Sequence, residues 1–230
     1  MKKRKIFIAC DSSNLKIVKK IITNTKSNKL DIGYKFGLEF FYSKYGRNFI
    51  SRLKDKKIFL DLKLNDIPNT CASAIYSLKD LKNISFITVH INGGFEMLKA
   101  VKKASLKTKK NLKVLGVTVL TSFSNTSIKK IGHTKSIKKL IIKQAVLAKK
   151  AKLDGIVCSG YEVKFLKRIC KNMEIVTPGI RFKGDKANDQ KRIISPKSAF
   201  DNGASAIVIG RSITNGNIKS NVQKLIKSFN

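Results

Sequence analysis

The sequence predicts an α/β fold, a single-domain (β/α)8 (TIM) barrel that spans residues 1–230. Three observations predict it: short apolar runs recur along the whole chain, stretches with helical periodicity separate them, and polar residues follow the end of nearly every run. Near-continuous apolar strands that alternate with helices are typical of a parallel sheet covered by helices. Eight units of about 29 residues are enough to close such a sheet into a barrel.

The apolar and β-branched runs give the expected strands. In chain order they are Ile6–Cys10, Ile32–Phe36, Ile58–Leu62, Phe86–His90, Val114–Leu120, Gly155–Cys158, Ile175–Thr177 and Ala206–Ile209. The stretches between them have the periodicity of amphipathic helices. Between residues 137 and 151, for example, one helix face is apolar and the other carries lysines.

An open, doubly wound sheet is the alternative architecture, and the polar residues at the strand ends favour the barrel. They are Asp11, Lys35, Asp61, Lys63, His90, Thr121, Ser122, Ser159, Arg181 and Arg211. An open sheet concentrates its functional residues at one switch point, whereas a barrel gathers them from the carboxyl ends of many strands. No linker, internal repeat or low-complexity tract indicates a second domain.

The chain is strongly basic. Its 230 residues include 49 Lys and Arg but only 14 Asp and Glu, which gives a formal net charge of +35. Such an excess is typical of nucleic-acid-binding proteins, because basic side chains neutralise phosphates. Lysines occur in nearly every segment, however, and only residues 1–5 resemble a basic arm. We therefore expect a general surface bias and no dedicated nucleic-acid partner, although a small anionic substrate would be attracted.

The cysteines and histidines predict no metal site. Cys10, Cys71, Cys158 and Cys170 show no C-x-x-C spacing, and with two histidines in the chain no zinc-ligand pattern can be assembled. We expect buried thiols in a reducing compartment. Asp11 ends the first apolar run below the roughly 7 residues of a signal-peptide core, and no run approaches the roughly 18 residues of a membrane span. A cytoplasmic location with no membrane partner is expected.

Candidate functional residues lie closest together in residues 58–70. The period of two in a strand places Asp61 and Lys63 on one face, toward the barrel mouth, with the neighbouring leucines on the other. An isolated pair of this kind is usually a structural ion pair. Here Asp11, Lys35 and Asp66 are expected to converge on the same rim, and a cluster of alternating charges in a cleft indicates a functional site.

The residues that follow predict a turn into a helix. Asp66 lies just beyond the strand, and Pro68 ends it. Either Asn69 or Thr70 can cap the helix that comes next.

The sequence also predicts a phosphate-binding site. The loops after strands seven and eight of a barrel commonly bind phosphate through backbone N–H groups. Gly179 and Arg181 open the seventh loop, which continues past Gln190, and Gly210 and Arg211 open the eighth. Gly210 permits a close backbone approach, and the Arg211 guanidinium can donate two parallel hydrogen bonds to phosphate oxygens.

Together these motifs resemble the orotidine 5′-phosphate decarboxylase family. The motifs that carry the resemblance are Y-K-F-G-L-E-F at residues 34–40, D-L-K-L-N-D-I-P-N-T at 61–70, L-T-S at 120–122, V-T-P-G-I-R at 176–181, D-Q-K-R at 189–192 and V-I-G-R-S at 208–212. They occur in the family's order and extend over nearly the whole chain. The family's metal-dependent relatives share a similar D-x-K-x-x-D strand, but I-P-N-T followed by D-Q-K-R is not their pattern.

The resemblance implies the decarboxylation of orotidine 5′-monophosphate to UMP in de novo pyrimidine biosynthesis, with no cofactor and no metal. It also implies the catalytic roles: Lys63 donates a proton to C6, Asp61 faces the substrate carboxylate, and Asp11 and Lys35 hold the ribose hydroxyls. A fixed ammonium suits this reaction because the carbanion left at C6 lies in the ring plane and cannot delocalise into the π system.

The remaining binding roles follow from the same resemblance. Thr121 and Ser122 contact the substrate near the pyrimidine, whereas Arg181, Gln190, Gly210 and Arg211 bind the phosphate, with the seventh loop as a lid. Asp66 and Thr70 reach into the neighbouring subunit's site, which implies a homodimer with shared active sites.

Two other classes of function remain open. A Schiff-base aldolase would use Lys63 as a nucleophile. A basic nucleic-acid-binding protein that has lost catalysis would retain the barrel and bind RNA or DNA with strong salt dependence. His90 has no visible partner in the sequence, and we expect it to be a packed side chain without a catalytic role.

Overall fold

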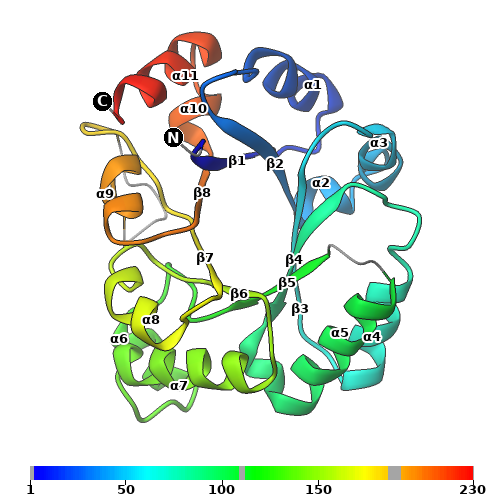
Figure 1. Ribbon diagram of the computed structural model, residues 1–230, viewed down its shortest axis with the longest axis vertical. Coiled ribbons are helices and arrows are strands. Elements are labelled where there is room, and N and C mark those ends of the chain that lie inside the picture. Colours follow the sequence, from blue (N-terminus) through cyan, green and yellow to red (C-terminus); the bar gives the residue numbers. More distant parts are fainter. Residues whose placement is uncertain (1–2, 109–111, 186–192, 230) are drawn as a thin grey trace.

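The computed structural model describes residues 3–108, 112–185 and 193–229, and in these residues the expected barrel is confirmed. Eight parallel strands of the described chain pair in sequence order, and β1 pairs with β8 to close the barrel (Figure 1). The strands are β1 (Lys5–Ala9), β2 (Asp31–Gly37), β3 (Ile58–Leu64), β4 (Ile84–His90), β5 (Lys113–Val117), β6 (Gly155–Val157), β7 (Glu174–Thr177) and β8 (Ala206–Ile209). Each lies within a few residues of an apolar run in the sequence.

Helices connect the strands and form the outer layer of the barrel (Figure 1). They are α1 (Leu15–Asn24), α2 (Leu38–Phe41), α3 (Gly46–Arg52), α4 (Pro68–Tyr76), the 3-10 turn η1 (Ile91–Gly93), α5 (Gly94–Thr108), α6 (Asn125–Lys130), α7 (Ile137–Lys150), α8 (Val163–Ile169), α9 (Pro196–Asp201), α10 (Arg211–Thr214) and α11 (Ile218–Lys227). The amphipathic pattern of α7 is confirmed, because Ile141, Ala145 and Ala148 are buried whereas its lysines are exposed.

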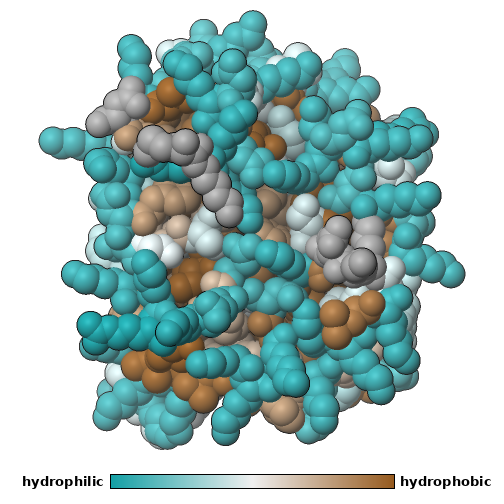
Figure 2. Space-filling view, in the orientation of Figure 1, coloured by the Kyte–Doolittle hydropathy of each residue, from teal (hydrophilic) through white to brown (hydrophobic). Residues whose placement is uncertain are grey.

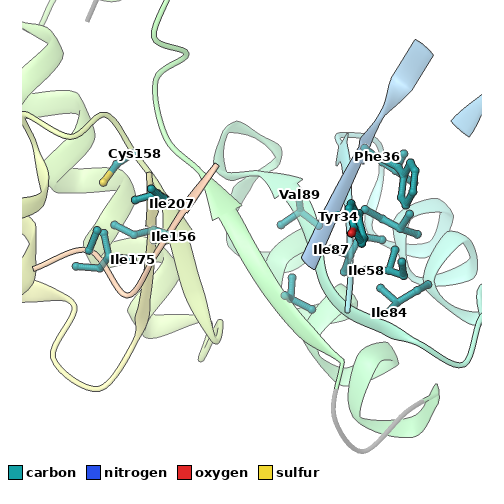
Figure 3. Packing of buried hydrophobic residues seen from close by; sticks show 14 of the residues in the cluster. Tyr34, Phe36, Ile58, Ile84, Ile87, Val89, Ile156, Cys158, Ile175 and Ile207 are labelled. Atoms are coloured by element: carbon teal, nitrogen blue, oxygen red, sulfur yellow. The ribbon is translucent and has the colours of Figure 1, made fainter. Parts of the chain in front are cut away.

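The apolar residues of the strands pack into two regions. One region lies between the strands and the helices. Figure 3 shows labelled side chains of β2–β4 gathered in one part of it and labelled side chains of β6–β8 in another. The other region fills the barrel interior, where the rings of Phe7, Phe59 and Phe86 contact one another with centroids 5.2–5.7 Å apart. This aromatic plug gives the cavity above it a rigid floor, and Phe59 lines that cavity.

Two local expectations were wrong. The fifth strand ends at Val117, three residues earlier than expected, and residues 119–122 line the cavity. Neither Asn69 nor Thr70 caps α4, because the helix begins at Pro68 and its N-cap is Ile67, which makes no side-chain cap hydrogen bond. Proline is favoured at the first helical position since its φ is already helical, and this placement moves the expected caps into the first turn.

Ion pairs surround the amino-terminal ends of the strands, opposite the end that carries the site. Glu174 at the start of β7 accepts hydrogen bonds from Lys113 at 2.6 Å and from Lys5 at 3.3 Å. Lys57 pairs with Asp31 at 2.6 Å in the same way. Burial on its own raises the pKa of Glu174, but hydrogen bonds from Lys113 and Ser205 and the charge of Lys5 outweigh it and lower that pKa to about 2.

The basic side chains are spread over the surface. Figure 2 shows hydrophilic residues over most of the visible face, interrupted by separate hydrophobic areas. Among the described residues, no helix is both long enough and apolar enough to cross a membrane. The cytoplasmic location stays a prediction.

The ion pairs of Glu174 with Lys5 and Lys113 yield a prediction about stability and pH. Because the folded pKa of Glu174, about 2, lies below its ordinary value of 4.5, its contribution to stability is fully present above pH 4.5 and is lost as the pH falls toward 2. Glu174→Gln should therefore lower the free energy of unfolding at pH 7 by roughly 1–3 kcal/mol, a range that allows for solvent screening at the partly exposed lysines. Urea unfolding from pH 7 to pH 3 measures the difference, which should shrink in acid.

The control is Asp201→Asn, which breaks an exposed i,i+4 pair with Lys197 on α9. Such pairs contribute little, so this variant should unfold like the wild type at every pH. A Glu174→Gln deficit that is constant from pH 7 to pH 3 would contradict the prediction.

Candidate active site

One cavity of about 1070 Å³ opens at the carboxyl ends of the strands. It collects residues from the ends of β1, β2, β3, β5, β6, β7 and β8 and from the loops that follow them. Nine of the expected site residues line it: Asp11, Lys35, Asp61, Lys63, Thr121, Ser122, Arg181, Gly210 and Arg211. Closure of the barrel brings these residues together, although Asp11 and Arg211 lie near opposite ends of the chain.

Four charged side chains form an alternating row at one side of the cavity. Lys35 Nζ donates to both carboxylate oxygens of Asp11, at 2.7 and 2.8 Å, and lies 3.9 Å from Asp61 Oδ2. Lys63 Nζ donates to the same Asp61 oxygen at 2.9 Å. Asp61 therefore lies between two ammonium groups, and Lys35 lies between two carboxylates. Each charge is compensated by its neighbours in the row.

Burial makes this compensation necessary. Lys35 is only 8% exposed, and the Asp61 side chain is 16% exposed. Burial on its own raises the pKa of Asp61, but the charges of Lys35 and Lys63, with hydrogen bonds from Lys63 and Thr88, outweigh it and hold that pKa below its ordinary value. Asp61 is therefore an anion at neutral pH.

The backbone at Lys63 departs from a regular strand. Lys63 has a φ of +50°, a left-handed conformation that costs a residue with a side chain about 1–2 kcal/mol. The pairing of β3 with β4 is interrupted at the same place, between Leu60 and Leu64. The expectation that Asp61 and Lys63 both face the cavity is confirmed, but strand alternation is not the whole reason for it.

Thr88 on β4 is a contact that sequence reasoning missed. Its hydroxyl donates to Asp61 Oδ1 at 2.9 Å and accepts the Lys63 backbone N–H at 2.9 Å. The signal in the sequence was weak: Thr88 is one of three polar residues of a mostly apolar strand, with Ser85 and His90, at a spacing of two from His90. Burial, with a smaller effect from the Lys63 charge, lowers the pKa of His90.

The expected phosphate ligands line the cavity from the loops after β7 and β8. Arg181 is 6% exposed, and its Nη1 donates to the carbonyl oxygen of Ile180 at 2.8 Å. Gly179 has a φ of +75°, which favours glycine at this turn. Gly210 precedes α10, and Arg211 is its first residue. Gln190 lies outside the described residues.

Asp66 and Thr70 are exposed and do not line the cavity of their own chain. Asp66 Oδ1 accepts the backbone N–H of Ile67 at 2.6 Å. The four cysteines are buried as expected, and burial raises the pKa of Cys170 to about 11. Cys158 also lines the cavity, as do Ser12 and Asn215, which sequence reasoning did not single out.

A closed parallel barrel with a cavity of charged side chains at the carboxyl ends of its strands has the architecture of a barrel enzyme. Comparison with known proteins identifies the family. Residues 4–224 match the Orotidine 5′-phosphate decarboxylase / HUMPS family. The chain belongs to this family of enzymes, and the resemblance seen in its motifs is confirmed.

Individual relatives agree over nearly the full length. The orotidine 5′-phosphate decarboxylase of Prochlorococcus marinus (strain MIT 9312) is 44% identical over 219 residues, which cover 91% of this chain and 88% of that protein. That of Bacillus thuringiensis subsp. konkukian (strain 97-27) is 40% identical and covers 96% and 95%. The crystal structure of orotidine 5′-phosphate decarboxylase from Lactobacillus acidophilus matches with a TM-score of 0.85 at 34% identity, covering 99% of this chain and all of that chain.

Proposed function

We propose that this enzyme decarboxylates orotidine 5′-monophosphate to UMP in pyrimidine biosynthesis, with Lys63 as the proton donor to C6. The observation that carries the proposal is the row Asp11–Lys35–Asp61–Lys63, which ends in an ammonium group at the cavity. The family and its relatives supply the substrate class. A Schiff-base role for Lys63 is disfavoured, because its Nζ lies 2.9 Å from Asp61 Oδ2, and an ion pair with a carboxylate suits a charged proton donor better than a nucleophilic amine.

The chemistry follows from the charges. The bond between C6 and the carboxylate breaks, CO2 leaves, and the electron pair stays on C6 in the plane of the ring. Lys63 stabilises this local charge and transfers a proton from Nζ to C6, and the amine regains a proton from water. Asp61 already binds Lys63 and Thr88, so the geometry supports a role in which Asp61 holds the proton donor while it faces the substrate carboxylate.

The residues that follow β7 and β8 fit the phosphate. Arg181 and Arg211 offer guanidinium groups, and Gly210 allows the backbone to approach an anion closely. Binding energy from phosphate contacts, far from C6, can hold the pyrimidine against Lys63. Asp11 and Lys35, at the end of the row away from Lys63, are the proposed ligands of the ribose hydroxyls.

We also propose that a second copy of the chain completes each site. Asp66 and Thr70 are exposed outside the cavity of their own chain, and large apolar side chains lie exposed near them. These are Leu38 (48% exposed), Tyr42 (74%), Ile67 (66%) and Tyr76 (42%), on the neighbouring units β2–α2 and β3–α4. An isologous dimer would bury this surface and bring Asp66 of one chain toward Lys63 of the other.

The proton-donor proposal predicts that Lys63→Ala lowers kcat at least about 1,000-fold, because both the charge at C6 and the proton are lost. UMP binding should remain, since the phosphate and ribose contacts are elsewhere. Loss of the orotate absorbance measures turnover, and excess EDTA tests the expectation that no metal takes part. Lys164→Ala on α8 is the control for charge.

Two results would contradict this account. Turnover of Lys63→Ala near the wild-type rate removes Lys63 from the mechanism. A reduced substrate adduct on Lys63 after borohydride treatment indicates the Schiff-base alternative.

The phosphate assignment predicts that Arg211→Ala weakens UMP about 100-fold but uridine less than about twofold, because the guanidinium contacts only the phosphate. Calorimetric titration of both ligands measures the difference. Arg168→Ala, an exposed arginine of α8, removes the same charge away from the cavity and should affect neither ligand. Equal losses for UMP and uridine in Arg211→Ala would mean that the phosphate lies elsewhere.

The shared-site proposal predicts complementation. Lys63→Ala and Asp66→Ala homodimers should both be nearly inactive, but a heterodimer places both defects in one site and leaves the other intact. Random assortment makes half of the dimers mixed, so about a quarter of the wild-type activity should return after subunit exchange. Native mass spectrometry monitors the exchange. Confirmed exchange without recovered activity would place Asp66 in its own chain's site or outside the mechanism.

A further inference from the structure

We propose that Thr88 is a positioning residue, whose hydroxyl fixes the Lys63 backbone and the Asp61 carboxylate relative to each other. The inference rests on the proposed role of Lys63 as the proton donor. Thr88 does not line the cavity and is fully buried, so it does not contact the substrate. Its effect on the reaction must pass through the two residues that its hydroxyl binds.

The pairing of β3 with β4 shows why a hydroxyl is needed here. Leu60 pairs with Ile87 and Leu64 pairs with Val89, so three residues of β3 lie opposite the single residue Thr88. A strand that carries extra residues cannot continue its regular ladder of hydrogen bonds. The Lys63 N–H is bonded to the Thr88 hydroxyl at 2.9 Å, where a regular strand would use a carbonyl oxygen of its neighbour.

Lys63, Thr88 and Asp61 form a closed ring of hydrogen bonds that includes the Lys63 backbone N–H. Thr88 accepts from the Lys63 backbone and donates its proton to Asp61 Oδ1, while Asp61 Oδ2 accepts from Lys63 Nζ at 2.9 Å. The ring connects the ammonium of Lys63 to its own backbone through two other residues. Because a lysine side chain is long and flexible, this connection restricts where Nζ can lie.

The ring also holds the left-handed conformation of Lys63. A φ of +50° persists in a residue with a side chain only when its surroundings enforce it. Without the Thr88 hydroxyl, a buried N–H and a carboxylate oxygen each lose a partner, and the backbone is free to relax. Proton transfer is sensitive to small displacements of the donor, so the chemical step should suffer more than binding.

The test compares two substitutions of Thr88 with a matched control. Thr88→Val keeps the shape but lacks the hydroxyl, whereas Thr88→Ser keeps the hydroxyl. Thr118→Val removes another fully buried threonine hydroxyl of the barrel, one that donates to the Val157 carbonyl at 3.0 Å. Thermal unfolding of all three identifies effects of stability alone.

We expect Thr88→Val to lower kcat about 10- to 100-fold, in line with the loss of a hydrogen bond to a charged group, while KM changes less than about threefold. Thr88→Ser should stay within about fivefold of the wild-type kcat, and Thr118→Val within about twofold. A kcat of Thr88→Val within about twofold of the wild type, or equal losses in Thr88→Ser and Thr88→Val, would overturn the proposal.

A second measurement does not depend on turnover. Lys35 and Lys63 face Asp61 in every variant, and His90 is near Lys63, so removal of the Thr88 donor changes one influence on the pKa of Asp61. Carboxyl ¹³C NMR should show that this pKa rises in Thr88→Val and not in Thr88→Ser or Thr118→Val. An unchanged Asp61 titration in Thr88→Val would contradict the proposed contact.

The two readouts separate this inference from the proposed function. A wild-type enzyme that fails to decarboxylate orotidine 5′-monophosphate refutes the proposed function, and the Asp61 titration still decides whether Thr88 holds Asp61. If Thr88→Val does not fold, Thr88→Ala takes its place with the same expected losses. Failure of both to fold while Thr88→Ser is fully active and folded would assign Thr88 a role in stability alone and overturn the proposal.

Discussion

The mutual compensation of buried charges at the barrel mouth is the constraint on which the site depends. Lys35 and Asp61 are too buried to be charged without close partners, and each has an opposite charge on two sides. Loss of one member leaves another uncompensated, so the row acts as one unit. The ion pairs hold the charges in fixed orientations, which suits the proposed role of Lys63, because little reorganisation is then needed when charge develops beside it.

The barrel supplies this arrangement through strand order. β1, β2, β3 and β4 are consecutive neighbours about 4.8 Å apart, so residues that end successive strands lie next to one another. Asp11 follows β1, Lys35 lies in β2, Asp61 and Lys63 lie in β3, and Thr88 lies in β4. The aromatic plug of Phe7, Phe59 and Phe86 fills the interior below them, which prevents the strands from collapsing inward and keeps the charged ends at a fixed separation.

The apolar runs in the sequence were enough to predict the barrel, and the polar residues at the strand ends were enough to predict most of the cavity lining. Both patterns involve residues that are close together in the chain. Non-local pairing was not predictable in this way. The left-handed Lys63 and the contact with Thr88 arise from the irregular match of β3 with β4, which no single strand reveals.

Acidic residues are scarce in this chain, and several of them have an identifiable role in the fold or in the site. With 14 Asp and Glu against 49 Lys and Arg, a carboxylate is exceptional in this chain. Asp11 and Asp61 belong to the charged row, and Asp154 and Glu174 bind lysines and backbone or hydroxyl groups at strand ends. These four carboxylates therefore lie where the fold or the site uses an anion, whereas others, such as Asp201, are exposed. The positive field of the surface, together with Arg181 and Arg211 at the cavity, favours the approach of an anion.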